Sequence, residues 1–439
     1  MAFAKKSRKR RAHDFERENE RPVRQLEKDP PALEAFKSVW TKLMTTPIHL
    51  DSALSKVTPK QKTVLAQILP RILAQPLSLC EHFGVGVPEG EPWSLTSEQL
   101  SGWRPAVLLA ECMMKDLERG IAMPEATEND FPPLMIQEWK RDWAESGAKR
   151  LYDALIQSPP LSLRISRRVS REEALKELKK GSDLPVRASL STASPLAVRL
   201  EGYAPIMHTR LFEEGLMEIQ DEGSQFMALF ALAPEVYAPF LSAEPQEAKE
   251  IDKFPPLPSA RNLTIVDACA GAGGKALAFA DLMEGKGRVY GYDVFESKVA
   301  ALKKRAKRSK LNNLQGVLIP EHAEEEAIRK HHASADLVLV DSPCSGWGVL
   351  KRNPDIKWRG LGQGLDRLPE LQLRLLKTYA RLVKPGGKLV YGLCTSRKAE
   401  SIDVVARFAS EHPEFESLVG GFYGPGRTDG FYMHAFQRK

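Results

Sequence analysis

The chain contains 439 residues with a formal net charge of +7 and a sequence pI near 9.0. No apolar run approaches the roughly eighteen residues that a membrane helix needs, and the N-terminus lacks the apolar segment of a signal peptide, so we expect no membrane association and a cytoplasmic localisation. The length predicts two or three domains, and the basic excess is compatible with nucleic acid without establishing it. We expect a monomer.

The N-terminal segment 1–30 is charged and poor in apolar residues, which predicts a disordered tail. Its basic cluster, Lys5–Arg11, is as compatible with a solvated tail as with an arm that contacts RNA. Residues 31–129 follow with a helical pattern and carry no catalytic cluster. Thr58 and Thr96 begin capping-box sequences, and an amphipathic run starts at Arg104, so several capped helices are expected in this region.

Residues 130–246 have the pattern of a small α/β subdomain. Its expected strands alternate apolar with polar residues, as in a sheet with one covered face, and a helix opens at Ser170. These strands are Leu161–Ile165, Val186–Leu190, Leu196–Leu200 and Leu216–Gln220. They carry almost no aromatic residues, so a structural platform is favoured over RNA binding by base stacking.

From residue 247 onward, strand and helix patterns alternate as in a Rossmann-like domain. The strand-like Leu263–Val266 leads into the glycine motif Asp267–Lys275, and a helical pattern follows. Glycines at this position let the backbone approach a ligand closely, and the helix start offers free N–H groups. The motif is not a phosphate-binding P-loop, because its spacing is wrong and Ala276 stands where Ser or Thr is required.

A second strand, Arg288–Tyr292, ends at Asp293, where a carboxylate can accept hydrogen bonds from a ribose diol. A nicotinamide enzyme and an S-adenosylmethionine (SAM) enzyme would both show this arrangement. The following helix carries the basic run Lys303–Lys310, which we interpret mainly as a solvated face.

Two later strands each lead into a cysteine. Leu337–Val340 is followed by Asp341 and Cys344, and Lys388–Leu393 is followed by Cys394. Because buried parallel strands read as short apolar runs, both thiols should emerge at the carboxyl ends of strands in one sheet, where open α/β sheets bind their ligands. The alternative is that both are small buried hydrophobes.

The cysteine pattern as a whole indicates free thiols. The five cysteines are odd in number and widely spaced, with neither Cys-x-x-Cys nor histidines at metal-ligand spacing. Neither a disulfide framework nor a metal site is therefore expected. Two reactive thiols at the sheet edge favour SAM over a nicotinamide cofactor, since an oxidoreductase has no use for them.

Taken together, these segments resemble the RsmB/Sun (NSUN-like) family of SAM-dependent RNA 5-methylcytosine methyltransferases, most closely the bacterial RsmB type. The resemblance covers roughly residues 159–439. The matching segments are Leu211–Gly215, Gln220–Gln225, Asp267–Lys275, Asp341–Gly346, Lys351–Trp358, Lys384–Tyr391 and Asp429–Tyr432. The resemblance implies a Rossmann-like methyltransferase domain (247–439) after an RRM-like α/β subdomain and a helical region that in relatives is often NusB-like and RNA-binding.

The chemistry of this family explains the residue types. Carbon 5 of cytosine is a poor nucleophile, so a thiolate must first add to carbon 6, and the carbon 5 proton must leave after methyl transfer. The resemblance assigns the nucleophile to Cys394 and the release step to Cys344, although Pro343-Cys344 is the pattern in which DNA methyltransferases carry their nucleophile. It places Asp341 against the base and Lys275 in the active site. The residue types alone allow Asp341 to be a loop cap and Lys275 a solvated lysine.

The resemblance also implies the SAM-binding residues, which are Cys269, Ala270, Gly271, Ala272, Gly273, Gly274, Lys275, Asp293 and Asp341. The chain departs from the family pattern at several positions. Leu393 replaces a usual Thr, Ser396–Ser401 lacks the Pro-Glu-Glu-Asn run, and Glu321 or His322 stands where an Asp beside the adenine is usual.

The loop 342–366 is rich in Gly, Pro and Trp. Its residues Trp347, Trp358 and Pro354-Asp355 are hypothesised to line a pocket for an extruded cytosine, with a core anchor as an equal alternative for Trp358. The expected substrate is RNA, with small-subunit rRNA ahead of tRNA. A non-catalytic RNA-binding relative and a Rossmann oxidoreductase are the competing hypotheses.

Overall fold

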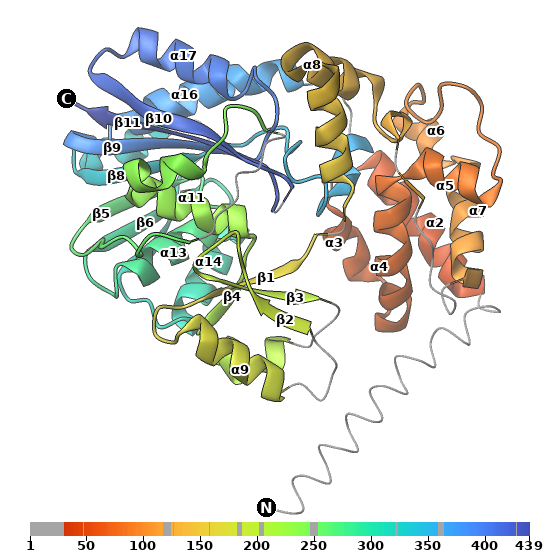
Figure 1. Cartoon of the computed structure of the whole chain (residues 1–439), viewed down its shortest axis with the longest axis horizontal. Helices are drawn as coiled ribbons and strands as arrows, with labels where there is room; N and C mark the ends of the chain where they lie inside the picture. The colour runs from red at the N-terminus through yellow and green to blue at the C-terminus, as the bar shows by residue number, and fades with distance from the viewer. Residues whose placement is uncertain are drawn as a thin grey trace, which may run out of the picture. The chain divides into compact units, whose positions relative to one another are not determined.

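The computed structural model describes residues 30–46, 48–116, 124–125, 127–157, 159–181, 187–201, 206–245, 253–320, 324–358, 364–426 and 428–439 (Figure 1). The predicted tail before Pro30, and both Glu321 and His322, lie outside these residues. The chain divides into two compact units. Unit 1 comprises Met1–Ser158 with Leu350–Gln363, and unit 2 comprises Pro159–Val349 with Gly364–Lys439.

Unit 1 is helical, as the sequence predicts for residues 31–129. Its helices are α2 (Pro30–Thr45), α3 (Leu50–Ala53), α4 (Pro59–Ala74), α5 (Pro76–Phe83), α6 (Ser97–Ser101), α7 (Arg104–Asp116) and α8 (Pro133–Leu155). The expected capping boxes at Thr58 and Thr96 are both present, with the Thr oxygen accepting from the N–H of Gln61 and of Gln99. Each box pairs two groups that a helix start otherwise leaves without a partner, which explains where α4 and α6 begin.

A short segment from the distant loop 342–366 packs into the core of unit 1. This segment is the 3-10 helix η6 (Pro354–Trp358). The Trp358 ring packs against Trp40 and Trp93 at centroid distances of 5.3 and 4.8 Å, and its indole N–H donates to the Leu73 carbonyl at 2.9 Å. Trp358 is therefore a core anchor, and the hypothesis that it lines a cytosine pocket is wrong. The physical reason is its large apolar ring, which unit 1 buries almost completely.

Lys357 is buried beside Trp358. Its ammonium donates to the carbonyl oxygen of Asp130 at 2.7 Å and to that of Ala74, and it lies 4.4 Å from the centre of the Phe131 ring. Burial lowers the pKa of Lys357 to about 7. Backbone carbonyls and aromatic rings thus replace the water that this cation loses.

The stability of unit 1 should therefore rise with pH. In an unfolded chain the pKa of a Lys side chain is about 10.4. Between about pH 7 and pH 10 the unfolded chain therefore holds a proton that folded Lys357 has lost, and the free energy of unfolding increases with pH. We expect Lys357→Met to flatten this rise. The measurement is urea unfolding followed by tryptophan fluorescence, which reports on unit 1 because every tryptophan except Trp347 lies there. Lys62→Met, at an exposed site, is the control, and equal slopes in both variants would contradict the assignment.

Unit 2 begins with a small antiparallel sheet in the order β2-β3-β1-β4. Its strands are β1 (Leu161–Ile165), β2 (Arg187–Leu190), β3 (Ala197–Glu201) and β4 (Met217–Ile219), with α9 (Arg171–Gly181) after β1 and α10 (Arg210–Glu213) before β4. The predicted strands and helix are confirmed within a residue or two. This succession of strands and helices is that of a ferredoxin-like subdomain, the topology expected of an RRM-like unit.

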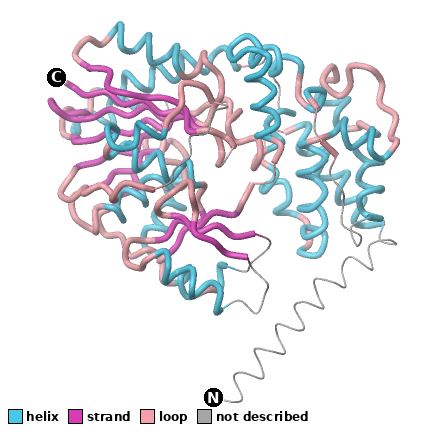
Figure 2. The backbone as a smooth tube through the Cα atoms, viewed as in Figure 1, coloured by secondary structure: helices cyan, strands magenta, loops and turns pink. Residues whose placement is uncertain are grey.

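The larger sheet of unit 2 has seven strands in the order β10-β11-β9-β8-β5-β6-β7 (Figures 1 and 2). The strands are β5 (Thr264–Ala268), β6 (Arg288–Asp293), β7 (Leu314–Leu318), β8 (Ala335–Asp341), β9 (Val383–Leu393), β10 (Phe415–Tyr423) and β11 (Phe431–Arg438). The pairs among β5 to β9 are parallel, and β11 is antiparallel to both β9 and β10. From β5 the chain runs outward through β6 to β7 on one side of the sheet, and from β8 to β9 on the other. The switch point therefore lies between β5 and β8, which is where such sheets bind ligands.

Helices cover both faces of this sheet. They are α11 (Glu222–Leu232), α12 (Pro234–Tyr237), α13 (Gly274–Leu282), α14 (Glu296–Arg308), α15 (Glu324–Ile328), α16 (Leu368–Ala380) and α17 (Ile402–Glu411). Figure 1 shows α11 and α13 along one side of the strands and α16 and α17 along the other. The apolar strand runs are thus buried on both faces, as their sequence predicts.

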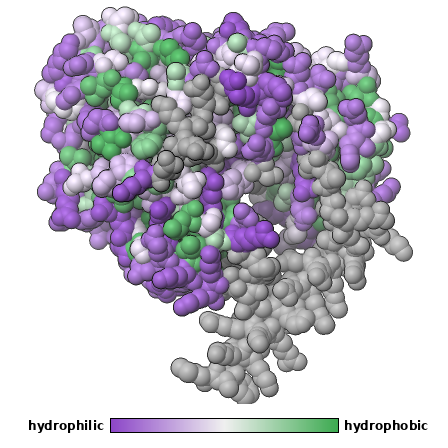
Figure 3. Space-filling view, viewed as in Figure 1, coloured by the Kyte–Doolittle hydropathy of each residue, from purple (hydrophilic) through white to green (hydrophobic). Residues whose placement is uncertain are grey.

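On the face drawn in Figure 3, hydrophilic side chains cover most of the described surface, with hydrophobic ones in scattered groups. In the described part of the chain, no single helix is long and apolar enough to cross a membrane. Only the pair α4 and α5 would pass by length and composition together, and the two are bent by 103°.

Candidate active site

The two thiols predicted at strand ends lie next to each other. In the parallel pair of β8 and β9, Asp341 stands opposite Gly392, and Cys344 and Cys394 follow these strand ends. Their Sγ atoms are 3.0 Å apart, within hydrogen-bonding distance for sulfur. The prediction that both emerge at the carboxyl edge of one sheet is confirmed. Both side chains are partly exposed, so they are not simply small buried hydrophobes.

A backbone chain ties the closing Asp429–Tyr432 motif to both cysteine loops. The N–H of Gly348 donates to the Cys394 carbonyl at 3.0 Å, and the N–H of Gly430 donates to the Gly348 carbonyl at 2.7 Å. A Cβ on Gly348 would lie 2.1 Å from the Gly430 oxygen, so only glycine permits this approach. Three segments that are distant in sequence are thereby held together.

Lys275 and Asp341 form an ion pair at this edge, with Nζ and Oδ2 2.6 Å apart. Lys275 lies in the first turn of α13, a position that disfavours a cation, and its side chain is only 10% exposed. Burial alone lowers its pKa, but the charge and hydrogen bond of Asp341, with further contributions from Asp267 and Cys394, leave the pKa raised. Lys275 is therefore held as a cation beside Asp341 and near the thiol of Cys394, and it is not a solvated lysine.

Asp267 is a further acid at this edge, one that the sequence singles out only as the start of the glycine motif. It ends β5 and is 1% exposed. Burial, and then the charge of Asp341, raises its pKa to about 8. It thus retains its proton at neutral pH, and a pair of adjacent charged carboxylates is avoided.

The glycine loop has the geometry of a cofactor cradle. The Gly271 N–H donates to Oδ2 of Asp293 at 2.7 Å, and the Ala270 N–H donates to the Tyr292 carbonyl at 2.8 Å. Cys269, Gly271 and Gly273 have φ angles of 65°, 55° and 87°, which turn the loop sharply. No heavy atom lies within 4 Å of the place where a Gly271 Cβ would stand, so the loop borders open space there. These residues fit SAM, with the carboxylate of Asp293 available to accept from its ribose.

Two arginines hold the other side of this loop. Arg305 of α14 donates to the Ala272 carbonyl at 2.7 Å, and Arg164 of β1 donates to the Gly274 carbonyl at 2.9 Å. Glu218 of β4 pairs with Arg305 at 3.0 Å. Sequence reasoning missed Arg164 and Glu218, because a charged residue in a short alternating strand reads as solvent-facing, whereas both side chains are almost fully buried.

Trp347 does not line an open pocket. It is fully buried, and the Arg397 guanidinium lies 5.1 Å from the centre of its ring. Because the ring is fully buried, the hypothesis that it lines an open pocket for an extruded base is wrong. Among the residues that the structure describes, no cluster of His, Cys, Asp and Glu could hold a metal ion.

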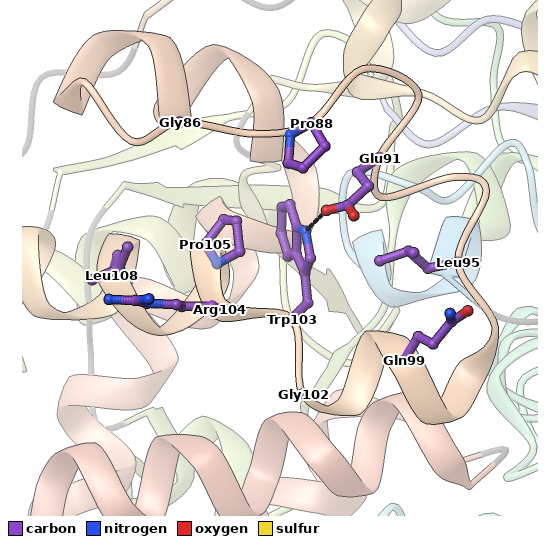
Figure 4. A pocket seen from close by; sticks show the side chains of 10 residues that line it. All are labelled: Gly86, Pro88, Glu91, Leu95, Gln99, Gly102, Trp103, Arg104, Pro105 and Leu108. Carbon is purple, nitrogen blue, oxygen red and sulfur yellow. Dashed lines mark hydrogen bonds between the residues drawn. The ribbon is translucent and has the colours of Figure 1, made fainter.

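One cavity of about 560 Å³ lies in unit 1, and none of its lining residues is among those that the sequence predicts to be catalytic. It is lined by residues of α6, α7 and the loop before them, and the Trp103 indole N–H donates to Glu91 beside it at 3.0 Å (Figure 4). Nothing in its lining repeats the chemistry of the sheet edge.

The seven-stranded sheet with its antiparallel strand β11, the glycine loop, the carboxylate of Asp293 and the two adjacent thiols together form the arrangement of a SAM-dependent methyltransferase. Comparison with known proteins identifies the methyltransferase family to which the chain belongs. The family described as 16S rRNA methyltransferase RsmB/F matches residues 257–429, and the ferredoxin-like domain of RsmF/B-like methyltransferases matches residues 131–207. The chain belongs to the RsmB/F family of methyltransferases, which confirms the resemblance and sets the oxidoreductase hypothesis aside.

Relatives and solved structures agree with this placement. The Bacillus subtilis (strain 168) protein named "Probable ribosomal RNA small subunit methyltransferase B" is 31% identical over 339 residues, which cover 72% of this chain and 68% of its own length. A Synechocystis protein of the same name is 28% identical, covering 78% of this chain and 70% of its own. The structure of NSun6 from Pyrococcus horikoshii with SFG has the same fold, with a TM-score of 0.57 and 16% identity over 70% of this chain and 98% of its own.

Removal of the Asp293 carboxylate should weaken SAM binding. Asp293→Ala loses the acceptor for the ribose and releases the N–H groups of Gly271 and Phe295, which donate to it at 2.7 and 2.9 Å. We expect the dissociation constant of SAM to rise about 10-fold or more, because an unpaired backbone donor adds to the lost contact. Isothermal titration calorimetry measures this, with Glu296→Ala on the exposed surface of α14 as the control. Equal constants for both variants would show that Asp293 is not part of the site.

Proposed function

We propose that the protein methylates carbon 5 of a cytosine in RNA through a covalent adduct between Cys394 and carbon 6. The observation that carries this proposal is the pair of thiols 3.0 Å apart, next to the ion pair of Lys275 and Asp341. SAM, bound on the glycine loop, supplies the methyl group. Adding the thiolate to carbon 6 moves the electron pair of the carbon 5–carbon 6 bond to carbon 5, which can then take the methyl group.

The protonation of the two thiols supports the proposed division of roles. The hydrogen bond to Cys394, followed by burial and the charge on Cys394, raises the pKa of Cys344 well above its ordinary value. The two sulfurs lie within hydrogen-bonding distance, and the raised pKa of Cys344 supports its role as the thiol that keeps its proton. The Lys275 ammonium lies near the sulfur of Cys394, and a cation in this position stabilises negative charge that develops during the reaction. Cys394 is thus the better nucleophile of the two.

The same contact explains how Cys344 could act later. Once Cys394 is bonded to carbon 6, its sulfur is a thioether without charge, and the largest cause of the raised pKa of Cys344 disappears. Cys344 can then ionise and accept the proton from carbon 5. The electron pair of that C–H bond restores the carbon 5–carbon 6 double bond and expels the Cys394 thiolate.

Asp341 and Lys275 are proposed to act on the base. The carboxylate of Asp341 accepts a hydrogen bond from N3 once that nitrogen has taken a proton from solvent, and this proton balances the negative charge that the thiolate brings to the ring. Lys275 fixes the orientation of Asp341 through their 2.6 Å contact. A charge held in place before the reaction costs no reorganisation in the transition state.

The RNA class is inferred from the relatives. The proteins from Bacillus subtilis and Synechocystis carry names that refer to small-subunit ribosomal RNA, and each match covers more than two thirds of either chain. We therefore propose small-subunit rRNA as the substrate, with tRNA as the alternative. The cytoplasm and a monomeric state remain predictions, as do the domain boundaries and a NusB-like identity for the helical region.

The substrate is tested with labelled SAM and total RNA from a strain that lacks the gene, followed by nucleoside mass spectrometry of the size-separated RNA. We expect new 5-methylcytidine in the small-subunit fraction. Its appearance in the tRNA fraction would keep the chemistry and change the target. Intact SAM binding without transfer to any RNA would support a non-catalytic RNA-binding relative.

The cysteine roles are tested by trapping the adduct. Cys344→Ser should accumulate a protein–RNA adduct that resists SDS, because the adduct forms but is not released, and Cys394→Ser should form none. Cys112→Ser, which changes a cysteine of unit 1, is the matched control and should behave as the unchanged protein. An adduct in Cys394→Ser and none in Cys344→Ser would reverse the assignment.

Loss of the Lys275 ammonium should slow methyl transfer. Lys275→Met leaves Asp341 without its partner and removes a cation near Cys394, so we expect the rate to fall about 100-fold or more, as on removing a preorganised electrostatic contact. Single-turnover kinetics at saturating SAM measures it. Lys298→Met, on the exposed side of α14, is the control. A rate unchanged in Lys275→Met would remove this residue from the active site.

A further inference from the structure

A single buried carboxylate connects the two loops that carry the thiols. Glu400, which is fully buried in the turn before α17, accepts from the N–H of Ser345 at 2.9 Å and from the hydroxyl of Thr395 at 3.2 Å. The hydroxyls of Ser345 and Thr395 lie 2.9 Å apart. Ser345 directly follows Cys344, and Thr395 directly follows Cys394. One side chain therefore holds the residue after each thiol.

Gln372 of α16 completes this arrangement on the other side of Cys344. Its amide donates to the carbonyl of Pro343 at 2.9 Å and to Glu400 at 2.8 Å, and it is fully buried. Pro343 directly precedes Cys344. The backbone on either side of this thiol is thus fixed by the same two side chains.

The groups around Glu400 compensate the buried negative charge of its carboxylate. Arg397 lies 3.3 Å from its carboxylate and is almost fully buried as well. The Tyr391 hydroxyl donates to the backbone carbonyl of Glu400 at 2.8 Å, which secures the turn itself. A buried carboxylate that accepts from a backbone N–H, a hydroxyl, an amide and a guanidinium is held in one position.

We infer that Glu400, together with Gln372, is a positioning residue that sets the separation of Cys344 and Cys394. The inference rests on the proposed function, in which one thiol must reach carbon 6 while the other reaches the proton on carbon 5. Neither side chain touches the sulfurs, so both act through the backbone of the two loops. A displacement of about 1 Å in such a site can reduce the rate about 100-fold.

Cross-linking of the thiols measures their separation without RNA or methyl transfer. Diamide oxidises two thiols to a disulfide, taking up their two protons and two electrons to become the hydrazine. The Cys344–Cys394 disulfide is quantified by peptide mapping under non-reducing conditions. Gln372→Met changes no charge and keeps a similar volume, so it tests geometry alone, and Glu400→Gln tests the central acceptor. Glu411→Gln, in an exposed ion pair with Lys377 at the end of α17, is the matched control.

We expect cross-linking to slow about 10-fold in Gln372→Met and Glu400→Gln and to stay unchanged in Glu411→Gln. Methyl transfer should lose kcat by about 10- to 100-fold in the first two variants, while the KM for SAM stays within about twofold. The charge of Glu400 also contributes to the raised pKa of Cys344, so a purely electrostatic role would make cross-linking faster in Glu400→Gln. Faster or unchanged cross-linking in that variant would overturn the inference.

Circular dichroism and SAM binding establish that each variant is folded. If Glu400→Gln does not fold, Gln372→Met decides the question, because it leaves the pair of Glu400 and Arg397 intact. Cross-linking at the original rate in a folded Gln372→Met protein would overturn the inference. Slower cross-linking in a protein that methylates no cytosine would leave the positioning role standing and remove the proposed function.

Discussion

The parallel pairing of β8 with β9 is the constraint on which the rest of the site depends. It aligns Asp341 with Gly392, so the chain leaves both strands at one edge and the two following loops run side by side. Parallel strands need a crossover, and here the crossover contains η6 and α16. The register of this one pair brings together the loops that carry Cys344 and Cys394, whose sulfurs lie 3.0 Å apart.

Electrostatic pairing then determines which groups at this edge carry charge. Lys275 is buried, but it remains a cation because Asp341 lies against it. Asp267 keeps a proton because its carboxyl group is buried and lies near the charge of Asp341. The edge thus holds one fixed ion pair and one neutral acid beside the thiols. Charges held in place in this way need no reorganisation when a reaction begins.

The ferredoxin-like subdomain contributes directly to the cofactor cradle. Arg164 from β1 reaches the carbonyl of Gly274, and Glu218 from β4 pairs with Arg305, which holds the carbonyl of Ala272. The glycine loop is therefore supported by charged groups from outside the seven-stranded sheet. A buried network of this kind is stable only when every member is paired, which links the position of the loop to the folding of the subdomain.

Sequence alone predicted the strands of the small sheet, the strands β5, β6, β8 and β9 of the large sheet and the chemistry-bearing residues, because apolar runs, glycine turns and strand-end polar residues depend on local physics. It placed Lys275, Asp293, Asp341 and both thiols at one sheet edge, and the structure brings them there. The position of Trp358 in the core of unit 1 could not be predicted from sequence, since an aromatic residue in a long loop suits a pocket and a core equally well. The roles of Arg164 and Glu400 could not be predicted from the residues around them in the sequence. Arg164 pairs with Gly274 and Glu400 with Ser345, and both partners are distant in the chain. Only tertiary packing decides which polar groups lose water, and that loss gives Glu400, Asp267 and Arg164 their roles.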